Sequence, residues 1–154
     1  MPEHLIGVIS DTHGLLRPQA VAALQGVELI IHAGDIGGPE ILEALEKVAP
    51  VFPVRGNVDK DGWARKLPQT RVVEVGGVQL YVLHVLYLLD LEPAEAGFQA
   101  VIYGHSHRAH LECKADVLYL NPGSAGPRRF TMPVSLALLR VSGHSLAAEL
   151  LELK

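Results

Sequence analysis

Seven side chains of the kinds that bind metal ions follow short apolar runs of this 154-residue sequence. Borderline divalent metals such as manganese, iron, cobalt, nickel and zinc prefer oxygen and imidazole ligands. Glycines at positions 34, 56 and 104 adjoin three of these side chains and permit the close backbone approach that a crowded centre needs. The pattern indicates a metal centre formed by Asp11, His13, Asp35, Asn57, His84, His105 and His107.

The spacing of these residues predicts that their side chains converge. Asp11 and His13 are two residues apart, as are His105 and His107, and in an extended segment this spacing points both side chains to one side. The carboxyl ends of parallel strands gather along one edge of an α/β sheet, where ligands bind. Any one of these residues alone could simply cap a turn. All of them together favour a shared site, because buried carboxylates without partners cost too much free energy.

The elements that must position these residues change character halfway along the chain. The first third alternates strand-like runs with helical segments, which predicts a parallel sheet covered by helices. The second half contains strand-like runs and a short helical segment, and Gly76-Gly77 is a hairpin signal. The C-terminal pair of strands is expected to close a second sheet as a hairpin. The expected strands are 5–9, 29–31, 51–54, 71–75, 78–84, 100–103, 117–120, 134–141 and 146–153, and the helices are 18–24, 39–48 and 92–98.

Composition restricts the classes of partner. The formal charge of −4 and pI near 6.0 give no general attraction for a polyanion, so long nucleic acid is not expected as a ligand. The run 75–89 is too short and too polar to cross a membrane, and the start MPEHLIGVIS lacks the features of a signal peptide. The single cysteine, Cys113, forms no internal disulfide. We therefore expect one cytoplasmic domain over residues 1–154.

Five short motifs occur in the order that is typical of one enzyme family. They are D-T-H at 11–13, G-D at 34–35, G-N at 56–57, an isolated histidine at 84 and G-H-S-H at 104–107. The sequence therefore resembles the calcineurin-like metallophosphoesterase superfamily over residues 5–128. It is most similar to the small bacterial and archaeal phosphodiesterases of this superfamily, which are relatives of the retromer scaffold subunit. The resemblance implies an α/β fold of two mixed sheets packed face to face and flanked by helices, a four-layer sandwich.

The resemblance also implies two divalent ions, with manganese first and nickel, cobalt, iron or zinc as alternatives. One ion would be held by Asp11, His13, Asp35 and His107, and the second by Asp35, Asn57, His84 and His105. Asp35 would bridge both ions, and a hydroxide between them would attack phosphorus. By the same resemblance Asp11, Asp35, Asn57 and His105 are catalytic. Asn57 and Arg128 are expected to bind the substrate, although Arg128 and Arg129 could equally be solvated loop residues.

Two positions depart from the family pattern. Many relatives carry a histidine directly after G-N, where this sequence has Val58, which cannot transfer a proton. The fourth motif is usually H-G-H, whereas here it reads His84-Val85-Leu86. The metal ligand is kept and a second histidine near the substrate is lost.

Taken together, these features favour a metal-dependent phosphodiesterase that acts on a small phosphate ester. A phosphomonoesterase is the alternative within enzymes, and an interaction scaffold is the alternative outside them. Some local roles stay open: His32 could orient a ligand or be a core histidine bonded to the backbone, and Asp59 could orient a ligand or cap a turn. Trp63, Leu86, Tyr87 and Leu88 could line a base-binding wall, form a homo-oligomer contact or belong to the core.

Overall fold

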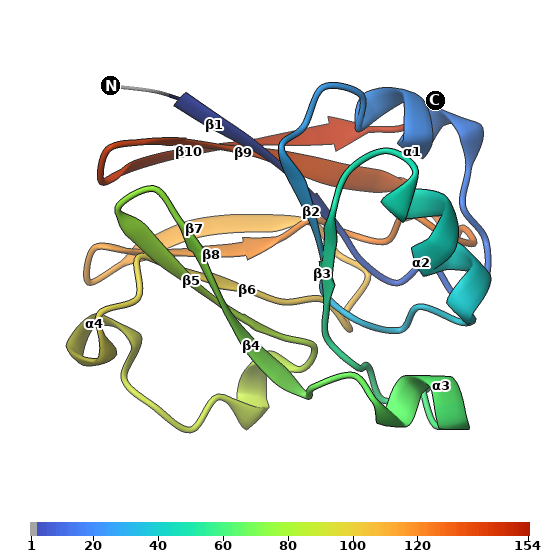
Figure 1. Ribbon diagram of the computed structural model, residues 1–154, viewed down its shortest axis with the longest axis horizontal. Coiled ribbons are helices and arrows are strands. Elements are labelled where there is room, and N and C mark those ends of the chain that lie inside the picture. Colours follow the sequence, from blue (N-terminus) through green and yellow to red (C-terminus); the bar gives the residue numbers. More distant parts are fainter. Residues whose placement is uncertain (1–2) are drawn as a thin grey trace.

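Two five-stranded mixed sheets form the centre of the computed structural model, which describes residues 3–154 (Figure 1). The first sheet has the order β10-β9-β1-β2-β3, with β1 to β3 parallel and β9 antiparallel to both β1 and β10. The second has the order β4-β5-β6-β8-β7, in which β5, β6 and β8 are parallel. The strands are β1 (Glu3–Ile9), β2 (Leu29–His32), β3 (Val51–Pro53), β4 (Thr70–Val75), β5 (Val78–Leu83), β6 (Ala100–Ile102), β7 (His110–Lys114), β8 (Val117–Asn121), β9 (Ser135–Ser142) and β10 (Ser145–Glu152).

Short helices cover the outer faces of the sheets. The two longest, α1 (Pro18–Ala23) and α2 (Pro39–Glu46), begin with a proline, which suits the first turn because its missing N–H has no partner there. Both lie on the outer side of the first sheet (Figure 1). The remaining helices are α3 (Gly62–Arg65), the 3₁₀ helix η1 (Leu86–Leu88) and α4 (Pro93–Ala96). None of the helices within residues 3–154 has the length and apolarity to span a membrane.

Strand periodicity separates three apolar clusters, one between each pair of layers. Val8 and Leu80 point between the two sheets. Ile9 faces the helices of the first sheet, and Leu83 faces η1 and the segment before β6. The expected four-layer arrangement of two mixed sheets is therefore confirmed.

The C-terminal hairpin lies in a different sheet from the one expected. Strands β9 and β10 pair with each other as predicted, but β9 also pairs with β1, from Glu3–Ser142 to Val8–Ala137, and so extends the first sheet. The prediction that this hairpin closes the second sheet is wrong. The apolar alternation fixes which face of β9 is buried, whereas the choice between two apolar sheets depends on contacts far apart in the sequence.

The carboxyl ends of five parallel strands meet at one edge of the two-sheet sandwich. Strands β1, β2 and β3 come from the first sheet, and β5 and β6 come from the second. Backbone hydrogen bonds join the loops that follow them, from the N–H of Asp11 to Gly34 O (3.0 Å) and from the N–H of Gly104 to His84 O (3.0 Å). The loops that carry the predicted metal-binding side chains are thereby held against one another.

Candidate metal centre

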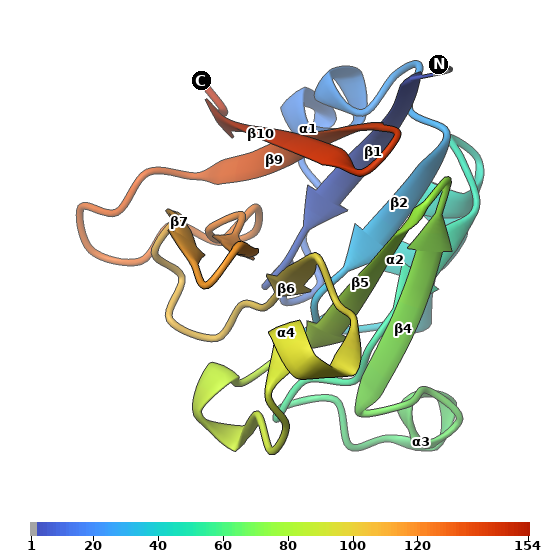
Figure 2. The ribbon, with the colours of Figure 1, turned by 90° about the vertical axis from the view of Figure 1, so that its left-hand side faces the viewer.

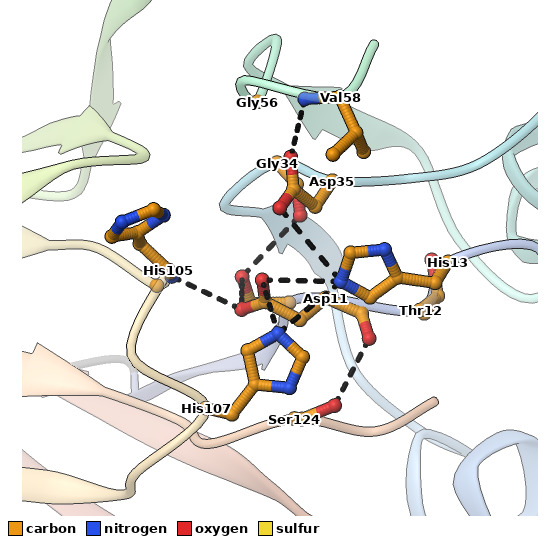
Figure 3. A network of polar contacts seen from close by, with 12 residues as sticks. Asp11, Thr12, His13, Gly34, Asp35, Gly56, Val58, His105, His107 and Ser124 are labelled. Atoms are coloured by element: carbon orange, nitrogen blue, oxygen red, sulfur yellow. Dashed lines mark hydrogen bonds and ion pairs between the residues drawn. The ribbon is translucent and has the colours of Figure 1, made fainter. Parts of the chain in front are cut away.

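The structure brings all seven predicted side chains together. Two groups have donor atoms within 4.8 Å of one another: Asp11, His13 and His107 form one, and Asp35, His84 and His105 form the other. The side chain of Asn57 lies against the second group, with its amide oxygen 3.3 Å from His105 Nδ1. Figure 3 shows Asp11, Asp35, His13 and His107 directed toward a common centre.

The two groups are continuous. Nε2 of His13 lies 3.7 Å from Asp11 Oδ1 and 3.7 Å from Asp35 Oδ2. Nε2 of His84 lies 3.0 Å from Asp35 Oδ2 and 3.7 Å from Asp11 Oδ1. Each carboxylate therefore faces imidazoles of both groups, as a two-ion site with shared ligands requires.

Asp11 provides the clearest indication of a cation. Its Oδ2 accepts hydrogen bonds from Ser10 Oγ (2.8 Å) and from the N–H of His105 (3.2 Å). Its Oδ1 is buried without a hydrogen-bond partner among the described residues, and His107 Nε2 lies 3.4 Å away. The Nε2 atoms of His13 and His107 also approach each other to 3.2 Å. A divalent cation would satisfy these converging lone pairs, so the residues present fit a metal.

The amide of Asn57 fits the same interpretation. With its nitrogen toward the cluster, the amide would donate to Asp35 Oδ2 (3.2 Å) and His84 Nε2 (3.1 Å). With its oxygen toward the cluster, it faces the Asp35 carboxylate and the ring nitrogens of His84 and His105, an arrangement that a cation between them would stabilise. The second orientation is the one that supplies a metal ligand.

The backbone reaches this geometry through left-handed residues. Of the eight non-glycine residues with positive φ between residues 3 and 154, five are Asp11 (56°), His13 (46°), Asp35 (56°), His105 (75°) and His107 (63°). Such conformations are uncommon outside glycine and cluster at functional sites. The expected convergence of Asp11 with His13 is confirmed, but the extended backbone proposed for it is wrong. His105 and His107 have positive φ as well, but they enter different groups.

Two glycines allow the loops to approach each other. Gly34 has a φ of 104°, and a Cβ there would lie 2.8 Å from His84 Nδ1. A Cβ on Gly56 would collide with the backbone nitrogen and Oδ1 of Asp35. Any larger residue at position 56 would therefore displace the central carboxylate.

Ser10, which the sequence did not single out for the site, and Ser124 and Asn121 fix Asp11 and the G-H-S-H loop. Ser10 donates to the Asp11 carboxylate, and Ser124 Oγ donates to the Asp11 carbonyl at 3.0 Å (Figure 3). Asn121 Nδ2 donates to Gly104 O at 3.2 Å. Serine and asparagine are common in loops, so their types alone carry no signal. Ser124 and Asn121 belong to the segment 121–124, which reads N-P-G-S and contacts the site.

Asp59 and His32 bond to the backbone of the site loops. The carboxylate of Asp59 accepts hydrogen bonds from the N–H groups of Ile36 (3.0 Å), Gly37 (3.1 Å) and Gly56 (3.0 Å). It therefore joins the loop of Asp35 to the loop of Asn57. Both alternatives considered for Asp59, turn cap and orienting residue, describe this single arrangement.

His32, the last residue of β2, is fully buried. Its Nδ1 accepts from the N–H of Gly34 (3.1 Å) and its Nε2 lies 3.0 Å from Thr12 Oγ1, which donates to Ile36 O. Burial lowers the pKa of His32 to about 4, so the ring is neutral at neutral pH. It holds the residues next to Asp11 and Asp35 without facing the centre.

Electrostatic coupling perturbs several groups of the centre. Burial alone would raise the pKa of Asp35, but the hydrogen bonds from His84 and from the Val58 N–H lower it below its usual value. Burial of His84 opposes its protonation, whereas its hydrogen bond with Asp35 favours protonation. The net effect raises the pKa of His84 above its usual value. Burial lowers the pKa of His107, and the hydrogen bond with Asp11 raises that of His13. Opposite shifts on clustered groups are typical of functional sites.

His84 is oriented by the backbone. Its Nδ1 lies 2.7 Å from Ala33 O and donates to it, which leaves Nε2 to face Asp35. Metal-binding histidines characteristically donate their second ring nitrogen in this way.

Two arginines flank the opening of the centre on the side of His13 and His107. Arg128, Arg129 and Pro127 line a cavity of about 200 Å³ together with these histidines. The pKa of His107 is lowered mainly by burial, and the charge of Arg129 lowers it further. The negative charge of Asp11 acts in the opposite direction. Both arginines are exposed, and neither forms an ion pair with another described residue. Substrate binding by Arg128 stays a prediction, and Arg129 has an equal position for it.

Comparison with known proteins identifies relatives over nearly the whole chain. The calcineurin-like phosphoesterase superfamily domain matches residues 5–144. A probable metallophosphoesterase of Methanothermobacter thermautotrophicus is 39% identical, with a match that covers 96% of this chain and 91% of that protein. A phosphodiesterase of Methanocaldococcus jannaschii is 30% identical over 77% of this chain and 82% of its own length.

Solved structures have the same fold. A novel archaeal phosphodiesterase superposes with a TM-score of 0.80 at 25% identity and covers 96% of this chain and 99% of its own. Vps29 of Chaetomium thermophilum superposes with a TM-score of 0.78 at 23% identity, covering 97% of this chain and 96% of its own. The second likeness concerns the fold alone.

Proposed function

The chain belongs to the calcineurin-like phosphoesterase superfamily, and from this premise we propose that it is a metal-dependent phosphodiesterase that hydrolyses a small phosphodiester. The phosphodiesterases among its relatives favour a diester over a monoester as the substrate. The observation that carries the proposal is Oδ1 of Asp11, which is surrounded by imidazole nitrogens and has no hydrogen-bond partner between residues 3 and 154.

The proposed ligands divide between two ions. Asp11, His13 and His107 would hold the first, and His84, His105 and Asn57 would hold the second. Asp35 lies within 3.7 Å of imidazoles from both groups and would serve both. When bound, two divalent ions lower the pKa of a water between them and offset the charge of phosphoryl oxygens.

The other residues position these ligands and the substrate. Ser10 and the N–H of His105 fix the Asp11 carboxylate, and the N–H of Val58 fixes that of Asp35 at 3.0 Å. Arg128 and Arg129 can donate hydrogen bonds to the phosphoryl oxygens from the open side. The Val58 side chain cannot give a proton to the departing group, so the substrate needs a leaving group of low basicity or a proton from water.

Metal reconstitution tests the proposal. The protein is depleted of metal, saturated separately with manganese, nickel, cobalt, iron or zinc, and analysed for metal content. Hydrolysis of bis(p-nitrophenyl) phosphate is then compared with that of p-nitrophenyl phosphate. We expect two ions per chain and faster hydrolysis of the diester.

Other outcomes contradict the proposal. A reproducible content of one ion or less rejects the two-ion site. Preference for the monoester would make the chain a phosphomonoesterase, and inactivity with every metal would favour an interaction scaffold.

A further inference from the structure

A groove of about 360 Å³ opens directly beside Asn57 and His84. It lies between the loop that follows β3 and the segment that follows β5, both at the bottom of the molecule in Figures 1 and 2. Its volume falls within the range of about 300–1,000 Å³ that is usual for small-molecule sites. The groove adjoins the second group of proposed ligands. The cavity that is lined by Arg128 and Arg129 adjoins His13 and His107 of the first group.

One wall of the groove is apolar. Tyr81 and Leu83 of β5 form its floor, and Val85 and Leu88 continue it after the strand. Leu88 is 63% exposed, a large apolar surface left uncovered beside a polar centre. Of the four residues whose types suggested a base-binding wall, Leu88 alone lines this groove. Trp63 and Leu86 pack against the apolar clusters instead.

The rest of the lining is polar. Arg55, Gln69, Thr70 and Asp90 contribute to it, and their side chains form no hydrogen bond or ion pair with other residues between 3 and 154. One positive and one negative charge leave this part of the lining without net charge. A second phosphate would therefore gain no net attraction here, and a simple alkyl group would leave the polar groups unused.

We propose that this groove binds one ester arm of the substrate, and that this arm is an uncharged ring system with hydrogen-bonding edges, of the nucleoside class. The inference rests on the proposed phosphodiesterase function, because the groove opens at the two ligands nearest the second ion. The ring lies against Leu88 and Tyr81, and its edge meets Gln69, Thr70, Arg55 and Asp90. The substrate class is thereby a nucleoside phosphodiester.

Kinetics with two diesters that share a leaving group test this inference. Thymidine 5′-(p-nitrophenyl phosphate) and methyl p-nitrophenyl phosphate both release p-nitrophenolate, so the ratio of their kcat/KM values reports the binding of the thymidine arm. We expect the ratio to fall by about tenfold in Leu88→Asp and by a smaller factor in Gln69→Ala, because each variant removes one wall contact.

Leu111→Asp is the matched control. Leu111 is also an exposed leucine, at 40%, and lies in β7, three strands away from β5 in the second sheet. The control should keep the ratio of the parent protein. An unchanged ratio in both groove variants, in enzymes that still hydrolyse the methyl ester, would overturn the inference and leave the phosphodiesterase proposal intact.

A binding measurement tests the nucleoside site even if the proposed phosphodiesterase function is wrong. Saturation-transfer NMR with thymidine, on protein depleted of metal, detects the groove without any hydrolysis. Transfer should be present in the parent and in Leu111→Asp and should be lost in Leu88→Asp. If it occurs while no diester is hydrolysed with any metal, the groove is upheld and the proposed reaction fails. If transfer is absent from the parent, or persists in Leu88→Asp, the groove is not the nucleoside site.

Discussion

The backbone N–H of Val58 donates a 3.0 Å hydrogen bond to Oδ1 of Asp35 (Figure 3). The side chain of Val58 cannot transfer a proton, but its backbone N–H positions the carboxylate of Asp35. Its isopropyl group is 49% exposed at the mouth of the centre, so the side chain can be exchanged without breaking that hydrogen bond. Position 58 can thus be tested for proton transfer separately from its structural role.

Val58→His should raise the hydrolysis of diesters with poor leaving groups more than that of activated aryl diesters. General acid catalysis contributes about 10²–10⁴-fold, and an imidazole at this exposed position should recover part of it. The measurement is kcat/KM for a series of aryl and alkyl diesters, with equal metal content confirmed in both proteins. If the chemical step of the parent is insensitive to leaving-group pKa, another group supplies the proton and the expectation for Val58 is wrong.

Asp35→Asn should impair hydrolysis more than His84→Ala. Asp35 faces imidazoles of both groups and carries a negative charge, whereas His84 would contribute one neutral ligand to one ion. Loss of an outer-shell partner alone costs about 10–100-fold in metal affinity or activity, so we expect Asp35→Asn to lose more than about 100-fold. Metal content and circular dichroism should accompany the rates on bis(p-nitrophenyl) phosphate. A rate equal to that of the parent would remove that residue from the site.

Gly56→Ala should destabilise the protein and displace Asp35. The new Cβ would collide with backbone and carboxylate atoms of Asp35, and overpacking of this kind costs about 1–3 kcal/mol. Gly62→Ala is the control, because a Cβ there has no atom within 4 Å. Thermal unfolding should show a lower Tm for Gly56→Ala and an unchanged or slightly higher Tm for Gly62→Ala. Equal Tm values for the parent and Gly56→Ala would mean that the loops move apart freely.

The metal-free protein should lose stability in acid partly through His32. Its pKa is about 4 in the folded state, below the ordinary value of 6.5, so the unfolded chain binds the proton first. The contribution of His32 is complete above pH 6.5 and is lost as the pH falls toward 4, by about 3 kcal/mol in all. Urea unfolding at several pH values should therefore give a steeper acid loss for the parent than for His32→Gln. Parallel curves would show that the ring is protonated in the folded protein.

The convergence of the seven side chains could be predicted because it depends on local rules. Strands appear as apolar runs, parallel strands end on one side, and polar residues follow those ends. The prediction held even though the five strands belong to two sheets, since both sheets present their carboxyl ends to the same edge.

Features that depend on backbone dihedral angles or on distant pairing could not be predicted. Aspartate and histidine adopt the left-handed conformation more often than most non-glycine residues, but still too rarely for their type alone to predict it at Asp11 or His107. Strand β7 was missed for a similar reason. It is joined to β8 by Ala115 and Asp116, both with positive φ, and this turn lacks the glycine or asparagine that usually marks such a hairpin. The short helices α3 and η1 are each about one turn long and leave no periodicity in the sequence.

The pairing of β1 with β9 has a consequence for the nascent chain. During synthesis the ribosome releases β1 to β3 and the whole second sheet before residues 135–152 emerge. Until then the edge of β1 that will pair with β9 has unpaired backbone groups next to an incomplete core. Translation must therefore finish this hairpin before the first sheet can close. A pause in translation shortly before residue 135 would prolong the period in which β1 is open to another strand, and so favour aggregation.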